Sequence, residues 1–144
     1  MLYETDVIEA VCQHIEARGY SIRQKLNTTQ HGIDVIASSA APRSLELCVE
    51  AKGETSQRNG SERFGKPFDS AQVKVHVAEA FSTGAELRFA KGASDSRRVA
   101  LAFPKTALHL RYVASIEAAF TVLQLGVFWV AADRTVALVA PWSL

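Results

Sequence analysis

This sequence of 144 residues has almost no excess of either positive or negative charge. Sixteen Lys and Arg residues stand against fifteen Asp and Glu residues, so the formal net charge at pH 7 is +1. This balance argues against a protein that holds nucleic acid through its overall charge, because such binding needs a large excess of basic residues. Any contact with nucleic acid therefore depends on a local cluster of cations.

Cysteine and long apolar runs are also scarce. The two cysteines, Cys12 and Cys48, do not have the spacing of a metal or redox motif, so we expect buried thiols in a reducing cytosol. No apolar run approaches the roughly 18 residues that a membrane-spanning helix needs. The opening run MLYETDVIEAV carries acids where a signal peptide has a basic and then an apolar stretch. These absences predict a soluble, cytoplasmic protein with no membrane partner.

The apolar residues that are present, 48% of the chain, predict one α/β domain over residues 1–144. Their periodicity and the turn residues between them indicate a helix over 4–18, strands over 20–26, 32–38 and 45–52, a helix over 69–81, a strand over 99–103, a long helix over 106–123 and strands over 127–131 and 136–140. This order, α-β-β-β-α-β-α-β-β, is typical of a central mixed sheet flanked by helices.

Ionisable residues occupy unusual places in the hairpin predicted over 32–52. Asp34 lies inside the first strand, and Glu50 and Lys52 lie at the end of the second. Alternation puts Glu50 and Lys52 on one face, and antiparallel pairing brings Asp34 within side-chain reach. Two converging carboxylates suit Mg²⁺ or Mn²⁺, and the carbonyl of Ala51 offers another oxygen. The pattern predicts metal-assisted hydrolysis of phosphodiesters, with Lys52 supporting the attacking water or stabilising charge on a phosphoryl oxygen.

The runs GIDVIA and CVEAKG, separated by a polar loop, resemble the motif of the restriction-endonuclease-like superfamily, the PD-(D/E)XK nucleases. The similarity covers roughly residues 4–103 and is greatest to the branch that holds Holliday-junction resolvases and methylation-dependent restriction enzymes. It implies a restriction-endonuclease-like core, with Asp34 and Glu50 as metal ligands and Lys52 as the catalytic lysine. Ile33 stands where the family name has proline, which many members also lack.

The same resemblance gives two further candidate roles. Some members carry an additional acid on the leading helix that supports the metal; Glu4 and Glu9 both fit, and Glu4 is preferred because it lies on the apolar face. On the second predicted helix, Gln72 matches a glutamine that positions the lysine, a metal-bound water or a DNA phosphate. His76, one turn later, matches this pattern only in part, and we expect an ordinary histidine there.

The polar segment GETSQRNGSERFGKPFDS directly follows Lys52. We expect Arg58, Arg63 and Lys66 in this segment, together with Lys74 on the next helix, to contact the phosphates of nucleic acid, in the first instance DNA. A solvated surface loop of the same composition is the alternative interpretation.

The C-terminal strands are nearly continuously apolar and contain Phe128, Trp129 and Trp142. Strands of this kind are normally buried on both faces. They therefore predict core packing, a homodimer interface over residues 126–144 or the preceding long helix, or both.

Other functions stay open at this point. A non-catalytic module on the same fold could bind nucleic acid or protein, although it has no use for two carboxylates that repel phosphate. An enzyme acting on a nucleotide or tRNA is also compatible. The non-functional interpretation of the hairpin charges is a structural ion pair between Lys52 and Glu50 or Asp34.

Overall fold

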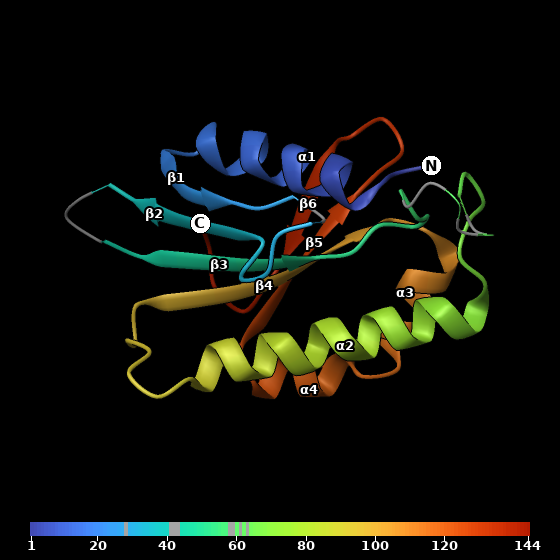
Figure 1. Cartoon of the computed structure of the whole chain (residues 1–144). Coiled ribbons are helices and arrows are strands. Elements are labelled where there is room, and N and C mark those ends of the chain that lie inside the picture. The colour runs from blue at the N-terminus through green and yellow to red at the C-terminus, as the bar shows by residue number, and fades with distance from the viewer. Residues whose placement is uncertain (28, 41–43, 58–59, 61, 63) are drawn as a thin grey trace.

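The computed structural model describes residues 1–27, 29–40, 44–57, 60, 62 and 64–144 (Figure 1). Arg58 and Arg63 lie outside the described residues. The elements follow one another as α1 (Glu4–Glu16), β1 (Tyr20–Lys25), β2 (Val35–Ser39), β3 (Glu46–Ala51), α2 (Ser70–Phe89), β4 (Arg97–Pro104), α3 (Ala107–Ala114), α4 (Glu117–Val122), β5 (Leu125–Val130) and β6 (Val136–Val139).

Within the described residues, a mixed sheet of six strands runs in the order β1 to β6. The first three strands pair antiparallel, β3, β4 and β5 are parallel to one another, and β6 returns antiparallel beside β5. Helix α1 covers one face of this sheet, and α2, α3 and α4 cover the other (Figure 1). The predicted fold class, a mixed sheet flanked by helices, is confirmed.

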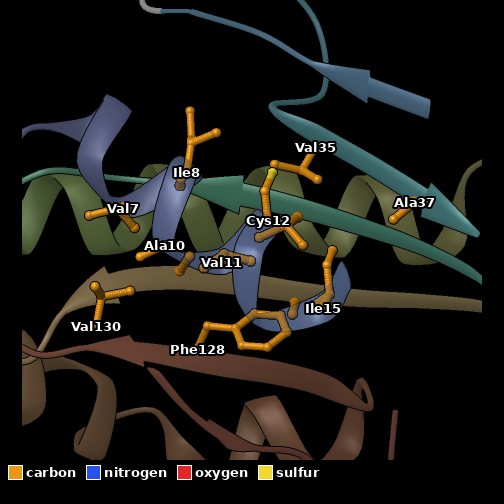
Figure 2. Packing of buried hydrophobic residues seen from close by; sticks show 14 of the residues in the cluster. Val7, Ile8, Ala10, Val11, Cys12, Ile15, Val35, Ala37, Phe128 and Val130 are labelled. Atoms are coloured by element: carbon orange, nitrogen blue, oxygen red, sulfur yellow. The ribbon is translucent and has the colours of Figure 1, made fainter. Parts of the chain in front are cut away.

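The apolar stripe of α1 forms one of the two cores. Val7, Val11 and Ile15 recur at every fourth position and pack against Val35 of β2 and Phe128 of β5 (Figure 2). All five side chains are fully buried. Because burial of each such side chain stabilises a fold by roughly 1.5 to 3 kcal/mol, this layer holds α1 firmly on the sheet.

The second core lies between α2 and the parallel strands. Val73, Val77 and Ala80 of α2 pack with Leu101 and Phe103 of β4. From Val99 to Phe103, strand β4 is covered on both faces, which explains why this part of its sequence is continuously apolar rather than alternating. The helix therefore lies beneath the carboxyl end of β3, where the predicted site residues are.

Two helices differ from the sequence-based prediction. Helix α2 continues to Phe89 instead of ending near residue 81, because Gly84 lets it approach β4 closely: a Cβ built there would lie 2.8 Å from Leu101 Cδ2. The long helix predicted over 106–123 is divided into α3 and α4. Ser115 donates a hydrogen bond to the Tyr112 carbonyl at 2.6 Å, and Ile116 leaves the helical region at φ −125°.

The last two strands are not equally buried. Every residue of β5 is buried, as predicted. The burial of β6 alternates instead, because it is an edge strand, and Val139 is 61% exposed.

Among the described residues, no helix is long and apolar enough to cross a membrane.

Candidate active site

The hairpin brings Asp34 to the end of β3. Val35 pairs with Val49, so the next position outward places Asp34 opposite Glu50. Asp34 directly precedes β2 rather than lying inside the strand as predicted. Its Oδ2 accepts a hydrogen bond from the backbone N–H of Ala51 at 2.7 Å, and its carbonyl accepts one from the N–H of Leu26 at 2.9 Å. These bonds hold the carboxylate against the segment that carries the other two predicted residues.

Glu50 and Lys52 form an ion pair at this end of the strand. The distance from Lys52 Nζ to Glu50 Oε1 is 2.8 Å, and the two side chains are 19% and 10% exposed. Burial acts to lower the pKa of Lys52, but the hydrogen bond and charge of Glu50 hold it above the ordinary value. Lys52 also donates its backbone N–H to the Ala102 carbonyl at 3.0 Å, so the parallel pairing with β4 continues beyond the end of β3. The ammonium is therefore charged and held in place.

The first turn of α1 packs against Gly53, directly after Lys52. A Cβ on Gly53 would lie 2.5 Å from the backbone nitrogen of Glu4, so glycine alone permits this close approach. Burial raises the pKa of Glu4, the charge of Glu50 raises it further, and Lys52 acts in the opposite direction. Glu9 lies elsewhere: it pairs with Lys25 at 2.7 Å and is 42% exposed. Of the two acids predicted on this helix, Glu4 is the one beside Lys52.

The electrostatics of Asp34 test whether a cation suits this place. Burial raises the pKa of Asp34 to about 7; the charges of Glu50 and Glu4 add to the rise, and the Ala51 N–H and Lys52 oppose it. The carboxylates of Asp34, Glu50 and Glu4 thus share one partly buried region with the ammonium of Lys52. A divalent cation would relieve their mutual repulsion, so the donor set is chemically suited to Mg²⁺ or Mn²⁺.

The size of this donor set is small. Among the described residues, no group of three or more His, Cys, Asp or Glu side chains is arranged to hold a metal ion. The three carboxylates predicted as ligands, Asp34, Glu50 and Glu4, therefore do not come together as one such group. Asp34 and Glu50 with the Ala51 carbonyl are the smaller set that remains. They match Mg²⁺, which takes one or two carboxylates and keeps several waters.

A cleft of about 780 Å³ opens beside Lys52. Asp34 and Glu50 do not line it, so Glu4 and Lys52 are the predicted site residues that face the open space. Polar side chains from several segments make up much of the wall. The lining residues are Glu4, Thr29, His31, Lys52, Gly53, Thr55, Ser56, Gln57, Phe68, His76 and Glu79.

Gln72, predicted to act at the site, is engaged in a helix cap. Its Oε1 accepts the backbone N–H of Asp69 at 3.1 Å, and its own N–H donates to Asp69 Oδ1 at 3.0 Å. This reciprocal pair starts α2. The cleft instead receives His76 and Glu79, four and seven positions later on the same helix face. The sequence-based prediction was an ordinary histidine at position 76, and it missed Glu79. The spacing of these two residues, four and seven positions from Gln72, is the signal in the sequence that could have identified them.

The described cations of the predicted phosphate-binding group lie away from the cleft wall. Lys66 is exposed, and its carbonyl accepts a hydrogen bond from Thr55 Oγ1 at 2.8 Å. Lys74 is exposed on α2. The hydrogen bond with Ser70 is the main cause that lowers the pKa of the nearby Tyr112 phenol, and the charge of Lys74 makes a smaller contribution. Because Lys74 and His76 are two residues apart, they point to different sides of the helix.

Comparisons with known proteins give one remote structural similarity. No protein-family model matches the chain, and no curated protein matches it. Among solved structures, the chain is similar to SfsA of Pyrococcus furiosus in complex with Ca²⁺, at 12% sequence identity and a TM-score of 0.37. The match covers 95% of this chain and 59% of that one, so this chain spans little more than half the length of SfsA. A similarity this low carries no argument about function.

Proposed function

We propose that this protein is a metal-dependent endonuclease that hydrolyses phosphodiester bonds in nucleic acid, with DNA as the first substrate to test. The observation that carries the proposal is the joint arrangement at the end of β3. Asp34 is bonded to Ala51, Glu50 is paired with Lys52, and Lys52 faces a cleft. Carboxylates that can hold a metal ion, next to a charged lysine that can stabilise a phosphoryl oxygen, suit metal-assisted hydrolysis of phosphodiesters.

The carboxylates have a binding role in this proposal. Asp34 and Glu50 would hold Mg²⁺ or Mn²⁺ together with the Ala51 carbonyl, and Glu4 would support the ion from the start of α1. The bound ion would supply a Lewis acid for the phosphoryl oxygen and would lower the pKa of a bound water. Asp34 is prepared for this role because the Ala51 N–H holds its carboxylate in one orientation.

Lys52 has a role in the transition state. Its ammonium orients the attacking water and stabilises the negative charge that grows on the phosphoryl oxygens. The pairing with Glu50 keeps Lys52 protonated and limits its motion, so little reorganisation is needed when the reaction occurs.

A non-catalytic nucleic-acid module accounts less well for the buried charges. Raising the pKa of Asp34 to about 7 means that its ionised form is disfavoured in the folded protein. A module that binds phosphate directly gains nothing from this cost, since carboxylates repel phosphate. A cation-binding site recovers the cost when the ion binds.

A cleavage panel tests the proposal. Supercoiled, linear, single-stranded and branched DNA, together with RNA, are incubated with Mg²⁺, with Mn²⁺ and with EDTA. We expect cleavage of at least one DNA form that requires the metal and is lost in Asp34→Asn and Glu50→Gln. Glu9→Gln is the matched control, because Glu9 is an exposed carboxylate of α1 paired with Lys25, and its cleavage rate should equal that of the wild type. Binding without cleavage under every condition would favour the non-catalytic module.

A further inference from the structure

Hydrogen bonds join the start of α2 to α3, which lies beside it (Figure 1). The hydroxyl groups of Ser70 on α2 and Tyr112 on α3 are bonded to each other, with 2.6 Å between their oxygens. Nη2 of Arg111 donates to both of these oxygens at 2.8 Å. The guanidinium also lies over the Tyr112 ring, 4.7 Å from its centroid. Arg111 is therefore held in one orientation although it is exposed.

Lys74 lies next to this group. It follows Ser70 by four positions, so the two side chains lie on one face of α2. The hydrogen bond with Ser70 is the main cause that lowers the pKa of the Tyr112 phenol, and the hydrogen bond and charge of Arg111 and the charge of Lys74 add to it. The surroundings of the Tyr112 oxygen thus favour negative charge. The four residues of this α2–α3 cluster are Ser70, Lys74, Arg111 and Tyr112.

The α2–α3 cluster has more hydrogen-bond donors than it uses internally. Every nitrogen of a guanidinium carries N–H groups, and only Nη2 of Arg111 is engaged. Among the described residues, no side chain or carbonyl accepts from the other nitrogens of Arg111, and no carboxylate pairs with Arg111 or Lys74. One of the two hydroxyl hydrogens lies between Ser70 and Tyr112, which leaves the other available. These donors and the two positive charges suit the oxygens of one phosphate group.

The α2–α3 cluster is close to the cleft but on another side of α2. Phe68 lines the cleft and precedes Ser70 by two residues. His76 also lines the cleft, whereas Lys74, two residues earlier, points to a different side of the helix. A helix is about 10 to 12 Å across, and a DNA strand carries one phosphate per about 3.4 Å of its axis. A strand with one phosphate beside Lys52 would therefore present another to the cluster about three or more nucleotides away.

We infer that the α2–α3 cluster is a second phosphate site, which binds a phosphate group of DNA away from the reacting phosphate. Arg111 and Lys74 supply the charge, and the hydroxyl groups orient Arg111 and donate to the same phosphate. This inference rests on the proposed function, since the strand that reaches the cluster is the one that enters the cleft. It extends the predicted contact of Lys74 to three further residues, whose role is to hold the strand.

The affinity for DNA tests the inference. It is measured in Ca²⁺ by fluorescence anisotropy at several salt concentrations, with a short duplex and with its single strand. Arg111→Gln should weaken binding about tenfold and reduce the slope of log affinity against log salt by about one, because one phosphate contact is lost. Lys74→Gln should act in the same direction. Tyr112→Phe keeps the ring and removes the hydroxyl, so it should cause a smaller loss of affinity than Arg111→Gln.

Arg88→Gln is the matched control. Arg88 lies in the last turn of α2, also donates to a neutral side chain, that of Gln124, and also lies over an aromatic ring, that of Phe89. The substitution removes the same charge from the other end of the helix, and it should leave the affinity and the salt slope nearly unchanged. The melting temperature of each variant shows whether the fold is retained.

Single neutral linkages locate the contact on the DNA. A methylphosphonate replaces one phosphate at a time along the strand, and the affinity of each duplex is measured for the wild type and for Arg111→Gln. We expect one position, about three or more nucleotides from the point of cleavage, at which the replacement weakens binding to the wild type but not to Arg111→Gln. Such non-additivity identifies a direct contact between the side chain and that phosphate.

The possible results separate this inference from the proposed function. Equal affinity and equal salt slope for the wild type and Arg111→Gln would overturn the inference and leave the nuclease function intact. An equal loss in Arg88→Gln would also overturn it, because the effect would then belong to the overall charge. Weaker binding of Arg111→Gln alone, without cleavage by the wild type under any condition, would support the phosphate site and overturn the nuclease function. Absence of binding to DNA would overturn the inference, and absence of binding to RNA as well would overturn the proposed function with it.

Discussion

The backbone N–H of Ala51 donates a hydrogen bond of 2.7 Å to Oδ2 of Asp34. This bond joins the residue before β2 to the end of β3, and it fixes how the hairpin carries its charges. A slip of one residue in the strand pairing would turn Glu50 and Lys52 to the opposite face and break this bond. The geometry of the proposed site therefore depends on the register of β2 and β3.

Asp34→Asn should stabilise the folded protein at high pH. The pKa of Asp34 is raised from 3.8 to about 7, so the stability that its protonated form contributes is fully present below about pH 4 and is lost as pH rises through 7. Asparagine can still accept a hydrogen bond from the Ala51 N–H. Because asparagine does not ionise, the variant does not lose stability as pH rises. At pH 8 we expect a gain of about 1 to 2 kcal/mol after discounting for solvent screening. The gain should shrink toward zero at pH 4.

Thermal unfolding from pH 4 to pH 9 measures this effect, with Glu9→Gln as the control on an exposed carboxylate. Mg²⁺ or Ca²⁺ should raise the melting temperature of the wild type at pH 8 and leave that of Asp34→Asn nearly unchanged. A variant that is less stable than the wild type at pH 8 would contradict the assignment of a buried, unfavourable charge.

Lys52→Ala should abolish detectable cleavage and change binding little. Loss of a preorganised charge costs about 10²- to 10³-fold in rate, because the charge acts mainly in the transition state. DNA affinity, measured in Ca²⁺, should fall by no more than about tenfold. If Lys52 were only a structural partner of Glu50, the variant would instead melt several degrees lower and cleave at the wild-type rate, because a buried carboxylate would have lost its counter-ion.

Gln72→Ala tests whether Gln72 takes part in catalysis, as predicted, or only caps α2, as the structure shows. Because its side chain closes the capping box of α2, its loss should cost about 0.5 to 1 kcal/mol of stability. The cleavage rate at a temperature well below unfolding should stay that of the wild type. Circular dichroism melts and initial rates provide the measurements, and a loss of rate without a loss of stability would return Gln72 to the catalytic set.

Gly53→Ala should disrupt the contact between the start of α1 and β3. The added methyl group would meet backbone atoms of Tyr3 and Glu4, at 2.9 and 2.5 Å, which cannot rotate away. We expect a loss of about 2 kcal/mol or more in the free energy of unfolding. Gly84→Ala is the control, because its methyl group meets the end of the Leu101 side chain, and urea unfolding should show a much smaller change for it.

The oligomeric state is a prediction that light scattering can check. Residues of the last helices and β6 leave apolar side chains exposed: Val122, Val139 and Leu110. We expect a two-fold dimer whose contact uses residues 126–144 or the helices α3 and α4. Val139→Lys should shift it toward monomer, whereas Val75→Lys, an equivalent change at an exposed valine of α2, should not. A wild-type monomer at high micromolar concentration would contradict this prediction.

The sequence predicted more of the sheet than of the helices. Strands have a two-residue period and turn residues at their ends, so the hairpin and the position of Asp34 opposite Glu50 could be predicted from the pattern alone. The break at Ser115 could not, because a side-chain bond to a carbonyl leaves no trace in the apolar periodicity. The extension of α2 past Gly84 depends on a close contact with Leu101, which is remote in sequence.

The candidate site was predicted in the same uneven way. The group formed by Asp34, Glu50 and Lys52 depends on strand alternation, which is local information. The roles of Gln72 and His76 depend on how α2 is rotated against the sheet and on how it is capped. Both are decided by packing against distant residues, and a single sequence does not contain that information.

The segment after Lys52 is closed at its base. The backbone carbonyl of Glu54 accepts a hydrogen bond from the N–H of Phe68 at 2.8 Å, and Thr55 and Pro67 form a β-bridge next to this bond. The entry and exit of the segment are therefore fixed side by side, independently of the residues between them. An insertion, a deletion or a graft from another protein between residues 56 and 66 would leave β3 and α2 in place. If the proposed function holds, this segment is where selection, or a protein engineer, can change which substrate shapes enter the cleft while Asp34, Glu50 and Lys52 stay in place.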